Sequence, residues 1–203
     1  MAVVVVCLCA LMARGAFVNE GFETGDFTGW TVGGNAEHGV GFDGDAISGT
    51  SVSGNYVKAR SGGQAAWVKL STTDPETTFS LEQTVPVTAG QKYEWGSSIG
   101  MFSDPPVAGA QFGLRRWING ALFSSGTSSV GSGFFTFTTG YTAPAGATNT
   151  TFKFEWTGNV AGGSMAGFSI DDVYFRAVPE PGTITGVGIL AFAFLVHRRV
   201  KFN

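Results

Sequence analysis

The sequence predicts an all-β protein whose body is a sandwich of two antiparallel β-sheets. Glycine supplies 31 of the 203 residues and phenylalanine 18, whereas charged residues make up only 13%. Apolar and polar residues alternate along the middle of the chain, and no stretch of the body shows ten residues of helical i, i+3, i+4 spacing. Short strands joined by many glycine-rich turns produce this combination.

The alternation divides the body into segments of strand length. The clearest break is Asn119-Gly120, a two-residue hairpin signal between two apolar runs. About eight strands at this spacing fit two packed sheets. The clearest segments are residues 79–85, 93–97, 111–118, 121–123, 134–138, 151–156 and 168–175.

Residues 1–16 are predicted to be a helical signal peptide. An apolar run over residues 2–12 is followed by small residues up to Ala16, as in the core of an export signal. No basic residue precedes the run, so we expect a basic leader upstream of Met1. The alternative is a buried first strand. The only cysteines, Cys7 and Cys9, lie in this segment, so the body has no disulfide framework.

Residues 177–203 form a second appendage, with three parts in order. The motif 178–182 reads VPEPG, the hydrophobic segment 183–197 follows, and the basic tail 198–203 closes the chain. The two prolines keep the motif extended. A helix of about 15 residues spans about 22 Å, which is shorter than a bilayer core of about 30 Å. We expect a short membrane helix whose basic end stays inside the cell.

This tail resembles the PEP-CTERM sorting signal of Gram-negative-type bacteria. The resemblance rests on Val178, Pro179, Glu180 and Pro181, on the short hydrophobic segment, and on Arg198 and Arg199. It implies recognition by an exosortase-type membrane peptidase, transient membrane insertion and removal of the tail. The implied destination is the cell surface or the extracellular polysaccharide matrix. The alternative is an ordinary tail anchor.

The body, residues 17–176, resembles the galactose-binding-like jelly rolls found in many carbohydrate-binding modules. Its start reads VNEGFETGDFTGW over residues 18–30, and its end reads FSIDDVYF over residues 168–175. The stretch LEQTVPVTAGQKY over residues 81–93 is similar to the middle strands of those domains. The resemblance implies a jelly-roll fold with its first and last strands close together, and it leaves the ligand open.

The same resemblance implies a structural calcium ion between the first and last strands. The matching positions are Glu23, Asp171 and Asp172, whose carboxylate oxygens suit calcium. The alternative is that these carboxylates cap turns or pair with Arg176 and Lys153.

A sugar site needs a flat aromatic side chain with polar groups beside it. Strand alternation places Gln111, Arg115 and Trp117 on one face and Phe112, Leu114 and Ile118 on the other. The second set is predicted to be core, so the first faces outward. Trp117 is therefore the first candidate for binding a polysaccharide, although it could also simply pack against its neighbours. Trp67 beside Lys69 is the second candidate.

Charge and titratable residues exclude several function classes. Residues 17–178 hold 14 acidic and 8 basic residues, a net charge of −6, which disfavours nucleic acid and anionic lipid as partners. The only histidine of the body, His38, is predicted to lie in a solvated loop. Glu94 and Glu155 lie mid-strand without a partner, so no catalytic pair is predicted.

We therefore expect an exported, non-catalytic protein of the cell surface or extracellular matrix that binds polysaccharide. The competing hypothesis is a purely structural matrix or biofilm component without a specific ligand. A glycoside-active enzyme is the third and least favoured hypothesis.

Overall fold

The computed structural model describes residues 16–71, 77–104, 110–130, 133–159 and 165–179, and within them the chain forms ten strands and no helix. The predicted terminal helices lie outside the described residues, as do Glu180, Pro181, Arg198 and Arg199. The strands are β1 (Thr31–Gly34), β2 (His38–Phe42), β3 (Gln64–Ser71), β4 (Thr78–Pro86), β5 (Lys92–Gly100), β6 (Ala110–Ile118), β7 (Ala121–Val130), β8 (Phe135–Thr142), β9 (Asn149–Asn159) and β10 (Met165–Ala177).

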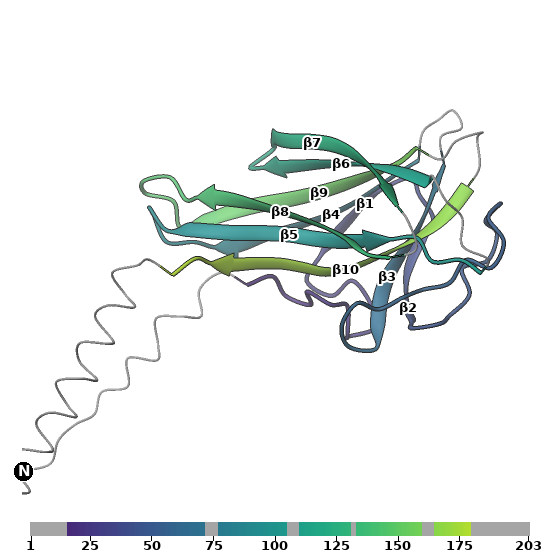
Figure 1. Cartoon of the computed structure of the whole chain (residues 1–203). Coiled ribbons are helices and arrows are strands. Elements are labelled where there is room, and N and C mark those ends of the chain that lie inside the picture. The colour runs from purple at the N-terminus through teal and green to yellow at the C-terminus, as the bar shows by residue number, and fades with distance from the viewer. Residues whose placement is uncertain (1–15, 72–76, 105–109, 131–132, 160–164, 180–203) are drawn as a thin grey trace, which may run out of the picture.

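The strands form two five-stranded antiparallel sheets packed face to face (Figure 1). Sheet A has the order β1-β4-β9-β6-β7, and sheet B has the order β2-β3-β10-β5-β8. Apart from the consecutive pairs β2–β3 and β6–β7, neighbours in each sheet come from distant parts of the chain, as the crossed connections of a jelly roll require. The predicted fold class is confirmed.

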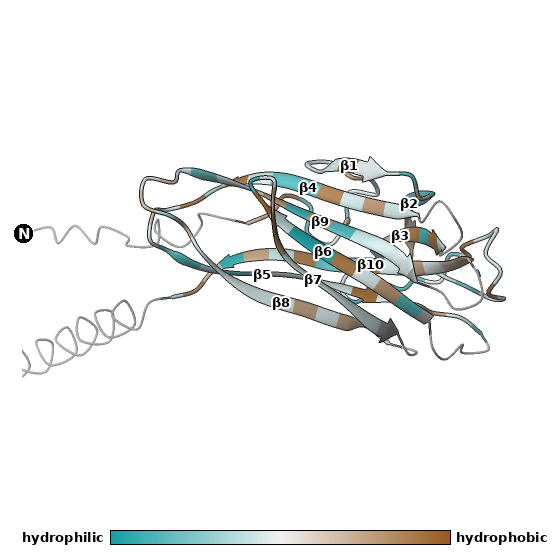
Figure 2. Cartoon of the chain, turned by 90° about the horizontal axis from the view of Figure 1, so that it is seen from above, coloured by the Kyte–Doolittle hydropathy of each residue, from teal (hydrophilic) through white to brown (hydrophobic). Residues whose placement is uncertain are grey.

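The core lies between the sheets and is largely aromatic. On β9, Phe152, Phe154 and Trp156 are fully buried, as their shared face predicts. The indole of Trp95 on β5 meets the rings of Phe152 and Phe154 at 4.8 and 4.9 Å between centroids. Figure 2 shows apolar and polar residues alternating along β4 and β6. The inward placement of Phe112 and Leu114 is confirmed by their exposures of 0% and 2%.

The hairpin between β6 and β7 turns at Asn119-Gly120, as predicted. Both residues have positive φ, 49° and 77°, which this turn requires and which glycine and asparagine adopt at low cost. The Asn119 side chain also accepts a hydrogen bond from the backbone N–H of Thr151, 2.9 Å away, so the turn is tied to β9.

The glycine-rich stretch around His38 is a strand rather than the predicted loop. His38 begins β2, and its ring packs against Phe27 and Phe79 at 5.6 and 5.0 Å between centroids. Its Nδ1 lies 2.8 Å from the carbonyl oxygen of Ala36. Glycine weakens strand propensity, but pairing with β3 along the whole of β2 supplies the order that the local sequence lacks.

The segment before β1 packs against the sandwich and links the start of the domain to its last strand, β10. Phe17 is buried, and its ring contacts those of Phe152 and Phe175. The carbonyl oxygen of Glu20 accepts a hydrogen bond from the N–H of Val173 on β10, at 2.9 Å. This docking brings Glu23 close to the last strand.

Candidate functional site

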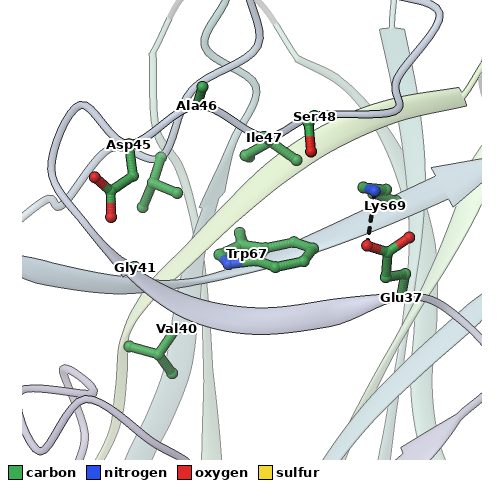
Figure 3. A pocket seen from close by; sticks show the side chains of 10 residues that line it. Glu37, Val40, Gly41, Asp45, Ala46, Ile47, Ser48, Trp67 and Lys69 are labelled. Atoms are coloured by element: carbon green, nitrogen blue, oxygen red, sulfur yellow. Dashed lines mark ion pairs between the residues drawn. The ribbon is translucent and has the colours of Figure 1, made fainter.

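A pocket of about 340 Å³ lies on the face of sheet B that points away from the core (Figure 3). Trp67 and Lys69 of β3 face this side, whereas Val68 and Leu70, which alternate with them, face the core. The loop between β2 and β3 folds over the pocket and supplies its other wall. The lining residues are Glu37, Val40, Gly41, Asp45, Ala46, Ile47, Ser48, Val57, Trp67 and Lys69.

The indole of Trp67 lies across β2 because the facing residue has no side chain. Gly39 pairs with Trp67 in the β2–β3 register, and a Cβ atom at Gly39 would lie 2.8 to 2.9 Å from three atoms of the indole. Ile47, Val57 and Ala65 form a small buried apolar cluster, against which Trp67 packs. The ring is thus held as a half-buried flat wall of the pocket.

Charged groups lie beside this ring. Lys69 is only 6% exposed, and its Nζ lies 2.8 Å from Oε1 of Glu37 and 5.8 Å from the centre of a Trp67 ring. Glu37 itself is largely exposed. Asp45 accepts a hydrogen bond from the N–H of Phe42 through Oδ2, at 2.8 Å. The pocket therefore combines an aromatic wall with several hydrogen-bonding groups.

The loop over the pocket is fastened to the outward side of β10. Ser169 Oγ accepts the N–H of Lys58 at 2.9 Å, and Asp171 Oδ2 accepts the N–H of Arg60 at 2.7 Å. Asn55 accepts the N–H of Gly167 at 3.1 Å. These bonds position the pocket-lining loop on a rigid sheet, which favours a preformed site.

The three residues first predicted to bind sugar lie elsewhere, on the outward face of sheet A. Arg115 pairs with Glu155 at 3.1 Å, and Glu155 also pairs with Lys153 at 3.1 Å. Gln111 lies farther along the same strand and is exposed. The structure thus brings Arg115 and Trp117 together with an ion-pair network and places Gln111 at a distance from Trp117.

Trp117 is half-buried within this network. The Nζ of Lys153 lies 5.9 Å from a Trp117 ring centre, and the indole Nε1 is buried without a hydrogen-bond partner among the described residues. Its N–H group is therefore not presented to a ligand as the indole stands.

The three predicted metal ligands separate into two groups. Glu23 accepts the N–H of Gly63 at 3.1 Å, and the buried Asp171 accepts backbone N–H groups of Arg60 and Ser61. A Cβ atom at Gly21 would lie 3.6 Å from Oδ1 of Asp171 and 3.9 Å from Oε1 of Glu23, so both carboxylates border the space beside this glycine.

Asp172 is not among the atoms nearest to a Cβ at Gly21. Its carboxylate pairs with Nη1 of Arg60 at 3.1 Å and accepts the hydroxyl of Ser61 at 2.6 Å. Its partner is therefore neither Arg176 nor Lys153. Among the described residues, no group of three or more His, Cys, Asp and Glu side chains is arranged to hold a metal ion. A cation here would need main-chain oxygens in addition to Glu23 and Asp171.

The electrostatics of Asp171 suit a cation nevertheless. Burial raises its pKa to about 6, against the lowering effect of hydrogen bonds from the backbone N–H groups of Ser61, Asp172 and Arg60. The neighbouring charge of Asp172 raises it further. The carboxylate form is thus disfavoured by its surroundings, and a bound cation would offset this cost.

The two mid-strand glutamates cannot act as a catalytic pair on one bond. Glu155 lies on the outward face of sheet A, and Glu94 lies on the outward face of sheet B, with the core between them. Burial raises the pKa of Glu155, but hydrogen bonds from Arg115 and Lys153 outweigh it and lower the pKa below its ordinary value. Such a carboxylate is a poor general acid.

The sequence indicated part of the pocket. Trp67 and Lys69 are adjacent outward positions of one strand and were the second candidate pair. Glu37 and Asp45 carried no signal, because they come from the segments before and after β2, and only the fold brings them to Trp67. Among the described residues, no helix has the length and hydropathy to cross a membrane.

No protein-family model matches the chain, and no curated protein matches it. Solved structures do. One is the N-terminal CBM22-1–CBM22-2 tandem domain of Paenibacillus barcinonensis Xyn10C, with a TM-score of 0.51 and 14% identity over 84% of this chain and 48% of that one. The chain thus spans about half the length of that tandem.

Two further solved structures are similar over single modules. The CBM61 module in complex with beta-1,4-galactotriose has a TM-score of 0.48 and 21% identity, over 81% of this chain and 98% of that one. The CBM22-1 xylan-binding domain of Paenibacillus barcinonensis Xyn10C has a TM-score of 0.48 and 15% identity, over 84% and 99%. At these identities the likeness concerns the fold, a jelly-roll sandwich shared with carbohydrate-binding modules.

The glycine beneath the indole gives a first prediction. We expect Gly39→Ala to displace Trp67 and lower the free energy of unfolding by about 1–3 kcal/mol, because the new methyl group overlaps the ring. Urea denaturation measures this loss. Gly126→Ala on β7 is the matched control, since a Cβ there meets nothing within 4 Å. Equal stabilities of the two variants would contradict the described packing of Trp67.

Proposed function

We propose that the domain binds a polysaccharide outside the cell through the pocket around Trp67. The observation that carries this proposal is the flat indole beside the Lys69–Glu37 ion pair in a preformed pocket. The apolar face of a pyranose ring stacks on such an indole, and its hydroxyl groups can bind to the charged groups at the rim. The fold shared with the CBM22 tandem supports the proposal by analogy.

Trp117 on sheet A remains a second candidate for the same function. Arg115 and Gln111 lie on its strand, and the outward face that they share is exposed in part. A lysine lies over the ring of each tryptophan, but the indole nitrogen of Trp117 is buried and only Trp67 lines the described pocket, which favours Trp67. The two sites lie on opposite outer faces of the sandwich, so single substitutions separate them.

A glycan-binding experiment tests the pocket. We expect Trp67→Ala to lose at least tenfold in affinity for the polysaccharide that the wild type binds, measured by pull-down on insoluble polysaccharides and on a glycan array, because stacking area is removed. Trp117→Ala is the control and should bind like the wild type. Circular dichroism checks that both variants are folded.

Three results would change the conclusion. Loss of binding in Trp117→Ala alone would move the site to sheet A. Wild-type binding by Trp67→Ala would exclude the pocket. If the wild type binds none of the polysaccharides, the domain is better described as a structural component of the matrix, the alternative function.

We further propose that the protein is exported and sorted by its tail. The support is the order of the motif at Val178–Pro181, the hydrophobic segment and the basic residues Arg198 and Arg199. Val178 is still tied to the domain, since its N–H donates to the carbonyl oxygen of Lys92 at 2.8 Å. The motif therefore begins at the last strand-bound residue that the structure describes, and we expect an exosortase-type peptidase to recognise the residues that follow.

Mass spectrometry of the mature protein tests this sorting. We expect the native protein to lack the hydrophobic segment 183–197 and the basic tail, and to lack the first residues as well. A Pro179→Ala/Pro181→Ala variant should keep its tail, because the extended motif is lost. An intact C-terminus in the wild type would instead show a permanent tail anchor or no processing.

A structural calcium ion is proposed for the space beside Gly21. Glu23 and Asp171 would hold it together with main-chain oxygens, and the ion would tie the N-terminal segment to β10. Its chemical contribution is a countercharge for the buried Asp171 carboxylate.

Calorimetry tests the calcium site. We expect millimolar calcium, but not magnesium, to raise the Tm of the wild type, because a ligand that binds only the folded state stabilises it. Glu23→Ala and Asp171→Ala should each lose this shift. Glu82→Ala, which removes an exposed-face carboxylate of β4 far from Gly21, is the control and should keep it. The absence of a calcium effect in the wild type would remove the site.

A further inference from the structure

The chain leaves the domain after β10 at one end of the sandwich. Lys92 binds Val178 there and pairs with Thr142 at the end of β8. The tip of the β6–β7 hairpin lies at the same end, since the N–H of Asn119 donates to the carbonyl oxygen of Thr151 at the start of β9 (Figure 1). We call this the exit end; it consists of residues 84–92, 117–123, 140–153 and 175–178.

The exit end exposes large apolar side chains. Leu122 and Phe123 follow the hairpin turn and are 52% and 45% exposed, and Val178 is 40% exposed. Phe123 reaches the ring of Trp95 at 6.0 Å, yet nearly half of its surface stays outside the core. Leucine and phenylalanine exposed beside a hairpin turn are unfavourable in water and favour a nonpolar partner.

The exit end carries a cation that no described acidic side chain offsets. The four segments contain Lys92, Lys153 and Arg176 and no aspartate or glutamate, although the domain as a whole carries −6. Lys153 pairs with Glu155, and Arg176 lies opposite Glu94 in the sheet, so Lys92 is the cation available to a partner. Lys92 is exposed and forms no ion pair with a side chain that the structure describes. The expectation that anionic lipid is disfavoured rested on net charge, which hides this asymmetry.

The chain beyond the domain brings this end close to a membrane. Only four residues separate Val178 from the start of the hydrophobic segment at residue 183, and the five Cα–Cα steps between them reach at most about 18 Å. This step rests on the proposed membrane insertion of that segment. An anchored domain would therefore hold its hairpin tip within reach of the headgroups.

We infer that the exit end is a membrane-contact surface, with Leu122 and Phe123 in the interface of an anionic lipid bilayer. Tryptophan, leucine and phenylalanine flanked by lysine are the composition of interfacial segments, and a lysine near an anionic surface is attracted to it. A lipid surface fits better than a protein partner because cations and apolar side chains occur together at the point where the chain turns toward the membrane.

The contact also orients the pocket. Lys69 pairs in register with Gly167 near the start of β10, whereas the exit end lies beyond the end of the same strand. A domain standing on its exit end thus presents the Trp67 pocket away from the lipid.

A fluorescent label tests the contact on the full chain. Cys7 and Cys9 are replaced by serine, and Leu122→Cys is labelled with the environment-sensitive dye NBD. The matched control is a label at Phe42→Cys, an exposed aromatic position on β2 at the other edge of the sandwich. Vesicles of phosphatidylcholine, with and without phosphatidylglycerol, are added, and co-sedimentation records whether the chain binds at all.

The expected result is a several-fold rise and blue shift of the label at position 122 on phosphatidylglycerol vesicles, with little change at position 42. A contribution of charge predicts that the fluorescence at position 122 rises less on pure phosphatidylcholine vesicles than on phosphatidylglycerol vesicles. It also predicts a smaller rise for Lys92→Glu on phosphatidylglycerol vesicles. Equal rises in these comparisons would contradict a contribution of charge. If the chain co-sediments but the fluorescence at position 122 does not change, the membrane-contact surface is excluded, whereas the membrane insertion of segment 183–197 is not. Equal responses at both positions also exclude the membrane-contact surface. A chain that does not co-sediment overturns both contact and anchor.

Discussion

The structure depends on β10, the central strand of sheet B, because its two faces support different parts of the molecule. Phe168, Ile170 and Phe175 point into the core, whereas Ser169 and Asp171 bind backbone N–H groups of the loop that covers the pocket. The buried Asp171 carboxylate carries a desolvation cost, seen in its raised pKa. The loop that covers the pocket is therefore held by a buried carboxylate, whose burial is unfavourable unless its hydrogen bonds to the loop are made.

Close packing explains much of the glycine content. The sequence suggested that glycine serves turns, and ten glycines do have positive φ. Others lie within strands, where a side chain would strike a neighbour: Gly39 lies beneath Trp67, Gly96 faces Tyr174, and Gly113 faces Thr157. Each of these positions allows a close approach by an adjacent strand, and Gly39 in particular leaves room for the indole of Trp67. The flat presentation of Trp67 is a direct result.

The two ends of the sandwich have different chemistry. The pocket lies toward the start of β10 and combines an indole with charged groups. The exit end combines exposed leucine and phenylalanine with lysines and arginine. If both proposals hold, the rigid sandwich sets the direction in which the pocket faces while the tail is attached, and removal of the tail leaves only the pocket to determine where the protein stays.

The class of fold, the inward faces of β6 and β9 and the β6–β7 turn could all be predicted from the sequence, because strand alternation and turn chemistry are local. The sequence did not show that β2 is a strand, since glycine gives no strand signal and the order comes from β3. Of the pocket residues, the sequence indicated Trp67 and Lys69 as candidates for sugar binding but gave no indication of Glu37 or Asp45. The groups that share a pocket, the pairing of Asp172 with Arg60, and the exposed apolar side chains near Lys92 became apparent in the fold alone, because long-range strand pairing sets which distant segments meet.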